Sequence, residues 1–258
     1  MPTEALSAYG NYRASHQAAG CGSRYELTYQ AGYYAALWNK IERPLLEGIL
    51  QRVGGPGRKC LDFACGTGRI AGVAAQFFDT VTGVDISESM LANAVSPANV
   101  KLQRGDITKV PLDEKFDVAT GFRFFLNAED SLKRDALLAI HRHLNDGGWL
   151  ICDIHVNANS PLGLVTRVLN RIRPAWRQNV ISRRQFARFL KESGFEIVGT
   201  EAYGYLPRPG HFLPGFCEIM VEPVEIACRK LRIPGQLAQG FIVVSRKRPL
   251  PYPGKTRA

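Results

Sequence analysis

The segment Lys59–Ala71 reads KCLDFACGTGRIA and contains the pattern of a strand, a glycine turn and the start of a helix. An apolar run ends at Asp62, glycines follow at Gly66 and Gly68, and a helical pattern begins directly after them. Because glycine has no Cβ, the backbone of such a turn can approach a ligand closely. The first N–H groups of the helix point to the same place. We therefore expect a nucleotide-like ligand at this turn.

Strands and helices alternate along the chain after Lys59. The apolar and periodic segments predict strands at 59–63, 80–84, 99–103, 115–120 and 147–155, and helices at 67–78, 87–95 and 130–144. Apolar strands separated by helices are typical of a parallel sheet that is covered on both faces. Right-handed crossovers then give a doubly wound sheet, which binds its ligand beyond the carboxyl ends of the strands. The predicted fold class is α/β with a doubly wound, mostly parallel sheet.

Carboxylates follow two of the predicted strands. Asp85 ends a strand 19 residues after Gly66, where a carboxylate can accept hydrogen bonds from both hydroxyls of a ribose. Asp106 and Ile107 follow the next strand and could bracket an adenine ring. A single acid of this kind is usually a solvated strand end. Several in this order, beside a glycine turn, favour a nucleotide site.

Composition indicates a cytoplasmic globular protein. The chain is 45% hydrophobic and 22% charged, which is ordinary for a soluble domain. We find no run of about 18 apolar residues and no secretory leader in MPTEALSAYG. The six cysteines are scattered without a C-x-x-C pair, so reduced thiols fit better than disulfides or zinc. No His/Asp/Glu cluster has the spacing of metal ligands, and we expect no metal.

The net charge of +10 is concentrated in two stretches. Residues 245–258 hold five basic side chains and no acid, and residues 154–191 hold eight basic side chains and no acid. Such local charge suggests a patch that faces an anionic partner. A solvated surface explains it equally well.

Four segments together resemble a known family. The segment Leu61–Gly68 resembles the first motif of class I S-adenosylmethionine-dependent methyltransferases, Gly83–Ser87 resembles their acidic second motif, and Gly105–Ile107 resembles their third. Gly147–Leu150 resembles the turn into their fifth strand. The resemblance covers roughly residues 25–157.

The resemblance implies a seven-stranded sheet whose last strand is antiparallel, and S-adenosylmethionine as the cofactor. Asp62 and the glycine turn would hold the amino acid part, Asp85 the ribose, and Asp106 with Ile107 the adenine. The cofactor residues that it implies are Asp62, Ala64, Gly66, Gly68, Asp85, Ile86, Met90, Asp106, Ile107 and Phe122. Ala64 departs from the family, which usually has glycine there, and its methyl group could shift the methionine moiety slightly.

Two other classes stay open. Gly66–Ala71 also satisfies the G-x-G-x-x-A pattern of NAD(P)-dependent oxidoreductases. In dinucleotide binders, however, the first glycine follows the strand almost at once. Here Asp62 intervenes, and it would repel a pyrophosphate but suits a cationic amino group. The third class is a non-catalytic scaffold that binds the cofactor without turnover.

The remaining segments are expected to shape the acceptor site. We expect residues 1–55 to form an N-terminal arm and a helical cap, in which Pro44 opens a second helix. Residues 56–248 would form the methyltransferase domain, with an insertion at about 206–236 before the last strand, and 249–258 a basic tail. Insertions at this place in the family tend to shape the acceptor pocket.

Three side chains are candidates for contact with the acceptor. His155 lies past the fifth strand, and its ordinary pKa of about 6.5 suits a general base. His211, in the insertion, is the second candidate for the same role. Arg123 lies beside the expected methyl group and could hold an anionic acceptor, unless it forms a salt bridge with Asp117 or Asp153.

A small molecule is the expected acceptor. The sequence has neither the N-P-P-Y type of tetrapeptide nor the Pro-Cys pair of base-modifying enzymes, so a nucleic acid acceptor depends on charge alone. Residues 160–180 interleave apolar side chains with Arg167, Arg171, Arg173 and Arg177. We expect this segment to dock at a membrane surface that presents an anionic or lipid-linked acceptor, or to pack as a lid over the pocket. The sequence does not indicate an oligomeric state.

Overall fold

The protein is described from a computed structural model, which places residues 12–13, 27–94, 96–173, 178–206 and 214–250. Seven strands form one sheet in the order β3-β2-β1-β4-β5-β7-β6. Their bounds are Gly55–Phe63 (β1), Phe78–Asp85 (β2), Val100–Arg104 (β3), Phe116–Gly121 (β4), Leu144–Ile154 (β5), Phe195–Tyr203 (β6) and Gly240–Lys247 (β7). Strand β7 pairs antiparallel with both β5 and β6, and the other strand pairs are parallel. The predicted fold class and the antiparallel last strand are both confirmed.

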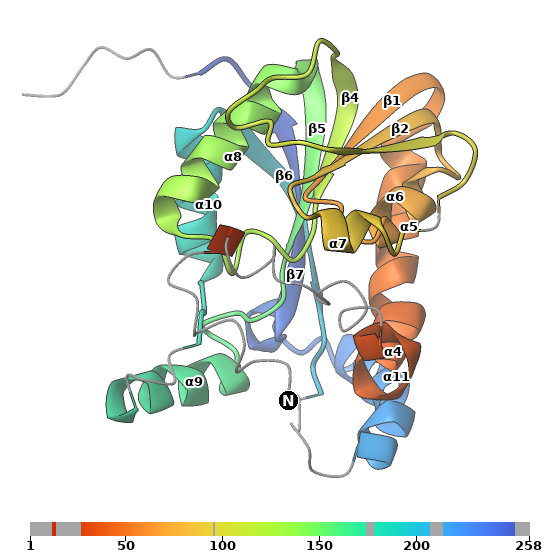
Figure 1. Cartoon of the computed structure of the whole chain (residues 1–258). Helices are drawn as coiled ribbons and strands as arrows, with labels where there is room; N and C mark the ends of the chain where they lie inside the picture. The colour runs from red at the N-terminus through yellow and green to blue at the C-terminus, as the bar shows by residue number, and fades with distance from the viewer. Residues whose placement is uncertain (1–11, 14–26, 95, 174–177, 207–213, 251–258) are drawn as a thin grey trace, which may run out of the picture.

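Helices cover both faces of the sheet (Figure 1). Their bounds are Gly32–Leu37 (α4), Arg43–Val53 (α5), Arg69–Ala74 (α6), Glu88–Leu91 (α7), Asp130–His143 (α8), Pro161–Ile172 (α9), Arg183–Glu192 (α10) and Pro214–Lys230 (α11). One apolar core lies between the sheet and helices α8 and α10. A second core joins the opposite face to α4, α5, α6 and α11. The predicted cap therefore packs directly on the sheet.

The helical cap contains the expected second helix, with Pro44 in the first turn of α5, but this helix is continuous with the one before it. A π-helical stretch, Trp38–Glu42, joins α4 to α5, so that Pro44 lies in a continuous helical run. The N–H of Arg43 donates to the carbonyl of Trp38, five residues earlier. Proline lacks an N–H, and its ring clashes with the carbonyl four residues before it in a regular α-helix. The wider π turn relieves this conflict, and it places Glu42 in the protein interior.

The insertion before the last strand contains a long helix. Helix α11 packs against α4, and its buried Glu225 accepts hydrogen bonds from the backbone N–H groups of Gly204 and Tyr205. These bonds tie the helix to the end of β6. Within the placed residues, no helix is both long and apolar enough to cross a bilayer.

The sheet order reverses between β1 and β4, which are adjacent but have their crossover helices on opposite faces. The carboxyl ends of β1, β2, β4 and β5 lie around this point. Ligands of doubly wound sheets bind there. The residues predicted for the site follow these strand ends.

Candidate active site

The turn after β1 has the backbone conformation that its glycines predict. Gly66 and Gly68 lie at φ of 56° and 79°, in the left-handed region. A Cβ built on Gly66 would meet no atom within 4 Å, so the inner side of the turn is open. Gly83 on β2 makes room for the turn, because a Cβ there would lie 3.0 Å from Cys65 Sγ and 2.4 Å from a methyl carbon of Leu102.

Ala64 also adopts the left-handed conformation, at φ of 54°. For a residue other than glycine this costs roughly 1–2 kcal/mol. The usual glycine of the family would relieve this strain. The Ala64 side chain borders both cavities described below.

Asp85 holds the turn in place from the end of β2. Its Oδ2 accepts the Gly66 N–H at 2.8 Å, and its Oδ1 accepts the Ser87 N–H at 2.8 Å. An ionised carboxylate offers about four acceptor positions. Asp85 also borders both cavities, so the same carboxylate can shape the turn and contact a ligand.

Asp62 presents a buried carboxylate oxygen at the end of β1. Its side chain is 1% exposed, and Oδ1 accepts the hydroxyl of Thr120 at 2.7 Å. Oδ2 is buried and has no hydrogen-bond partner among the placed residues. Burial raises the pKa of Asp62 to about 7, although the Thr120 hydrogen bond, the nearby Ala71 backbone N–H and the Arg69 guanidinium oppose the rise. An unpartnered buried acceptor is costly, and a cationic ligand would satisfy it.

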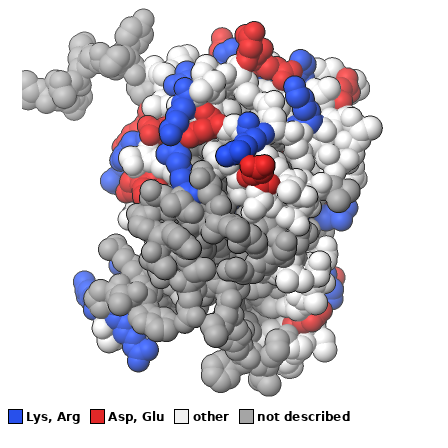
Figure 2. Space-filling view, in the orientation of Figure 1, with Lys and Arg blue, Asp and Glu red and all other residues white. Residues whose placement is uncertain are grey.

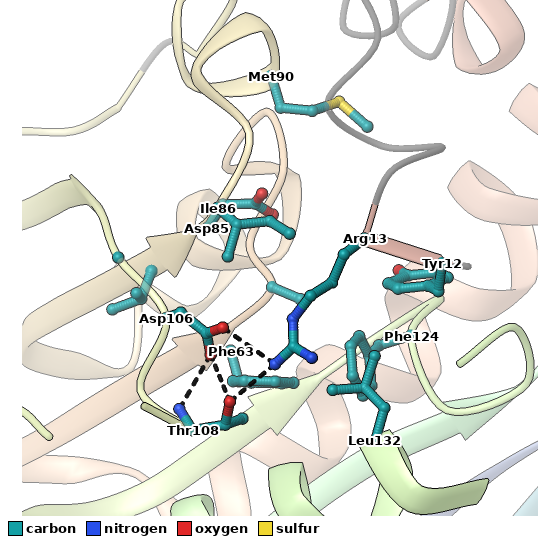
Figure 3. Close-up of a pocket in the computed structure, with 13 residues that line it drawn as sticks. Tyr12, Arg13, Phe63, Asp85, Ile86, Met90, Asp106, Thr108, Phe124 and Leu132 are labelled. Carbon is teal, nitrogen blue, oxygen red and sulfur yellow. Dashed lines mark hydrogen bonds and ion pairs between the residues drawn. The ribbon is translucent and has the colours of Figure 1, made fainter. Parts of the chain in front are cut away.

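Two adjoining cavities border the turn and share Tyr12, Ala64, Asp85 and Met90. The first is largely apolar and is drawn in Figure 3. Its other lining residues are Arg13, Phe63, Val84, Ile86, Gly105, Asp106, Thr108, Phe124 and Leu132. The second cavity is also lined by Asp62, Cys65, Gly66, Arg69, Ile70, Phe122 and Arg123.

Most of the predicted cofactor residues thus line one of the two cavities. Two do not. Gly68 is the N-cap residue of α6, and Ile107 is 1% exposed within the core, so that Thr108 borders the first cavity in its place.

Part of the N-terminal arm unexpectedly reaches into the first cavity. Arg13 Nη2 lies 2.9 Å from Asp106 Oδ2 and 2.8 Å from the Thr108 hydroxyl (Figure 3). The Tyr12 ring packs edge-on against Phe124 at a centroid distance of 5.1 Å. With these side chains present the cavity measures about 50 Å³, far below the roughly 300 Å³ of a small ligand pocket. Arg13 therefore occupies space beside the carboxylate predicted to contact adenine.

Arg69 brings a fixed positive charge to the second cavity. Its guanidinium lies 4.0 Å from the ring centroids of both Tyr29 and Trp38. Stacking between two rings fixes the side chain through cation–π contacts. The second cavity thus contains a carboxylate, Asp62, and a guanidinium, Arg69.

Arg123 is the centre of a buried ionic cluster. Its side chain is 13% exposed and pairs with Asp153 at 2.6 Å and with Glu42 at 2.5 Å. The Tyr29 hydroxyl lies 3.2 Å from Arg123 Nε, and the Tyr203 hydroxyl lies 3.3 Å from Nη1, the nitrogen that also pairs with Asp153. Each guanidinium nitrogen thus contacts a protein partner. The salt bridge to Asp153, one of the two expected alternatives, is present, and the pairing with Glu42 was not foreseen.

This cluster connects segments that are distant in the sequence. Arg123 follows β4, Asp153 lies on β5, Tyr203 ends β6, and Glu42 belongs to the π-helical stretch. Arg123 also adopts a left-handed φ of 62°. The cluster therefore fixes the cap against the carboxyl ends of the central strands.

The two candidate histidines differ in what the structure shows. His155 is 23% exposed, and its Nδ1 lies 3.8 Å from Asp153 Oδ2. Burial, together with the nearby Arg123 charge, lowers the pKa of His155 to about 3, so it is a weak base at neutral pH. It lines neither cavity. His211 lies outside the placed residues.

The donor set fits a nucleoside that carries a zwitterionic amino acid. The unpartnered Asp62 oxygen suits an ammonium group, Arg69 suits a carboxylate, and Asp85 suits ribose hydroxyls. A pyrophosphate fits poorly, because Asp62 and Asp85 would both repel it. The site chemistry therefore favours S-adenosylmethionine over a dinucleotide.

Comparison with known proteins gives the same result. Residues 60–148 match the family model described as a methyltransferase domain. The cypemycin N-terminal methyltransferase of a Streptomyces species is 36% identical over 121 residues, which are 45% of this chain and 45% of that protein. Phosphoethanolamine N-methyltransferase 3 of Arabidopsis thaliana is 27% identical over 175 residues, which are 65% of this chain and 30% of that protein. The chain spans less than half the length of these curated relatives.

The fold is also found among solved structures. Magnesium protoporphyrin IX methyltransferase from Synechocystis PCC 6803, crystallised with bound SAH, superposes with a TM-score of 0.63 at 14% identity, over 91% of this chain and 97% of that one. At this identity the likeness concerns the fold alone. Residues 60–148 thus contain a methyltransferase domain, and the sheet that surrounds them has the fold of class I S-adenosylmethionine-dependent methyltransferases.

Proposed function

We propose that the protein transfers the methyl group of S-adenosylmethionine to an oxygen or nitrogen atom of a small-molecule acceptor that is anionic or lipid-linked. The observation that carries the proposal is the buried, unpartnered Asp62 oxygen beside an open glycine turn. A scaffold without a ligand would gain stability by replacing such an acid. Retaining it is best explained by a cationic group that binds there.

We assign the cofactor contacts as follows. Asp62 accepts hydrogen bonds from the ammonium group, and Arg69, stacked between two rings, pairs with the carboxylate. Asp85 accepts the ribose hydroxyls, and Asp106 contacts the adenine once Arg13 has left it. These contacts would fix the cofactor at both ends.

The chain contributes to the reaction chiefly by alignment. When bound, S-adenosylmethionine supplies an electrophilic methyl group on a sulfonium centre. Phe122 and Arg123, which line the second cavity after β4, would border the acceptor. Holding two reactants in a near-attack geometry accounts for a large share of the rate of such a transfer. The placed residues that line the second cavity include no histidine, so we assign no protein general base.

The acceptor class is supported by charge and by two relatives. Phosphoethanolamine, named for the Arabidopsis relative, is a small amine with an anionic group. Magnesium protoporphyrin IX, which appears in the name of the structural neighbour, is also a small molecule, although a larger one. In this chain the segment that follows β5 has basic and apolar side chains without acids. This composition suits an acceptor that combines negative charge with apolar surface.

The proposal is tested by tracing the methyl group. The protein is incubated with methyl-labelled S-adenosylmethionine and a protein-free extract that contains metabolites and lipids. We expect label in an extractable small molecule, and none with Asp62→Asn. Label in the organic phase supports a lipid-linked acceptor, and label in the aqueous phase a soluble one. Cofactor binding without label transfer, under all extract conditions, would favour the non-catalytic scaffold.

A further inference from the structure

Helix α9 has an apolar stripe that the placed residues leave exposed. Leu164, Val165, Val168, Leu169 and Ile172 are 49, 54, 58, 51 and 68% exposed. At about 100° a residue they share one face that spans about 140° of the helix. Exposed apolar stripes of this kind mark interaction surfaces.

The opposite face of the helix packs on the protein through small side chains. Gly163 and Thr166 are its buried residues. A Cβ on Gly163 would lie 2.0 Å from the Asn157 carbonyl, so no larger residue fits there. Ser160 caps the helix by accepting the Gly163 N–H at 3.0 Å. The orientation of α9 is therefore fixed, and its apolar stripe is directed away from the body.

Basic side chains flank this stripe. Arg167 and Arg171 lie on one edge of it, and Arg173 follows the end of the helix, and all three are exposed. None of the ion pairs between placed residues includes them. Figure 2 shows basic and no acidic side chains on the surface of α9, at the lower left of the view. An apolar stripe with a basic edge is complementary to an anionic lipid surface.

The place of α9 in the fold relates this surface to the site. Helix α9 begins seven residues after β5 ends, and β5 carries Asp153 of the ionic cluster. In Figure 1, α9 and α11 both lie toward the lower end of the molecule. The first turns of α11 expose two more large apolar side chains, Phe216 at 57% and Ile219 at 69%.

We propose that α9 docks the protein on the surface of an anionic lipid bilayer, with its apolar stripe in the headgroup boundary and its arginines on lipid phosphates. The expected alternative, a lid packed over the pocket, would bury the stripe, which is exposed here. This surface deepens the proposed function, since it delivers a lipid-linked acceptor, but the docking itself does not depend on catalysis.

The test measures co-sedimentation with vesicles of phosphatidylcholine that contain phosphatidylglycerol, at low and high salt. We expect binding to the anionic vesicles only, weakened by salt because exposed charges are screened within about 10 Å at 0.1 M. Arg167→Gln with Arg171→Gln should weaken it about 25-fold, at about fivefold per arginine. Val168→Ser with Ile172→Ser should weaken it at least tenfold.

The matched control is Arg183→Gln with Arg184→Gln, which removes the same charge from exposed positions on α10. It should bind vesicles nearly as well as the wild type. Equal losses in both arginine pairs would overturn a specific role for α9, and so would a wild type that ignores anionic vesicles at low salt. A dimer that dissociates on Val168→Ser with Ile172→Ser, without vesicle binding, would assign the stripe to a second copy of the chain. The affinity for S-adenosylhomocysteine, measured for each variant, should stay unchanged. A loss of this affinity would bear on the proposed function and not on membrane docking.

Discussion

Replacing Asp62 by asparagine should stabilise the protein and weaken cofactor binding at the same time. Burial raises the pKa of Asp62 from 3.8 to about 7. At pH values between 3.8 and about 7, Asp62 is therefore protonated in the folded protein and ionised in the unfolded chain. Where the folded state binds more protons, stability falls as pH rises. The slope is about 1.4 kcal/mol per pH unit for one proton.

This slope gives a magnitude that can be measured. Between pH 5 and pH 8 the wild type should lose about 3 kcal/mol of stability through this one group. An asparagine does not titrate. From pH 5 to pH 8, the unfolding free energy of Asp62→Asn should therefore rise by about 3 kcal/mol relative to that of the wild type. Urea unfolding at both pH values measures it. The control Asp113→Asn removes an exposed carboxylate before β4 and should show no such shift.

Cofactor binding should show the opposite dependence on pH. The ammonium group of S-adenosylhomocysteine needs the ionised form of Asp62, which is scarce below its pKa of about 7. The wild-type affinity should therefore rise about tenfold between pH 6 and pH 7.5. Asp62→Asn should bind weakly at both values. A flat wild-type profile, or a variant that gains no stability relative to the wild type at high pH, would refute a role for ionised Asp62.

Three further substitutions test other parts of the site. Ala64→Gly should raise the unfolding free energy by about 0.5–1 kcal/mol, because glycine relieves the left-handed strain while losing more chain entropy; lower stability in urea would show that the strain is absent. Arg123→Met should cost about 3–5 kcal/mol, because two buried carboxylates lose their partner, and a shift below 1 kcal/mol in thermal or urea unfolding would contradict the cluster. Arg13→Gln should tighten S-adenosylhomocysteine binding severalfold by releasing Asp106 from a partly exposed ion pair; weaker binding would mean that the arm closes on the cofactor instead.

The parts of the site that sequence could predict are local in the chain. The glycine turn, Asp62 and Asp85 follow directly from strand ends and from the conformations that glycine allows. The doubly wound sheet followed from the alternation of strands and helices with right-handed crossovers, and its antiparallel last strand followed from the family resemblance. The division of the chain at residues 55 and 249 stays a prediction, as do the roles of the individual site residues.

The parts that sequence could not predict depend on contacts between distant residues. Arg13 and Asp106 are 93 residues apart, and Arg123 and Glu42 are 81 apart. Such pairs leave no periodic signal in a single sequence. Pro44 does lie in the first turn of α5, as its usual preference predicted, but no local signal indicated the π-helical stretch that joins α5 to α4. His155 was chosen for an ordinary pKa, which burial in this fold lowers to about 3.

Calorimetry with S-adenosylhomocysteine and NADH tests the central claim most directly, because it asks which ligand the glycine turn binds. We predict that the wild type binds S-adenosylhomocysteine and not NADH. Asp85→Ala should weaken that binding by about 2–3 kcal/mol, or roughly 30- to 150-fold, through the loss of the charge-assisted ribose contact. Thermal unfolding of the variant confirms that it is folded. Binding of NADH with no binding of S-adenosylhomocysteine would contradict the account.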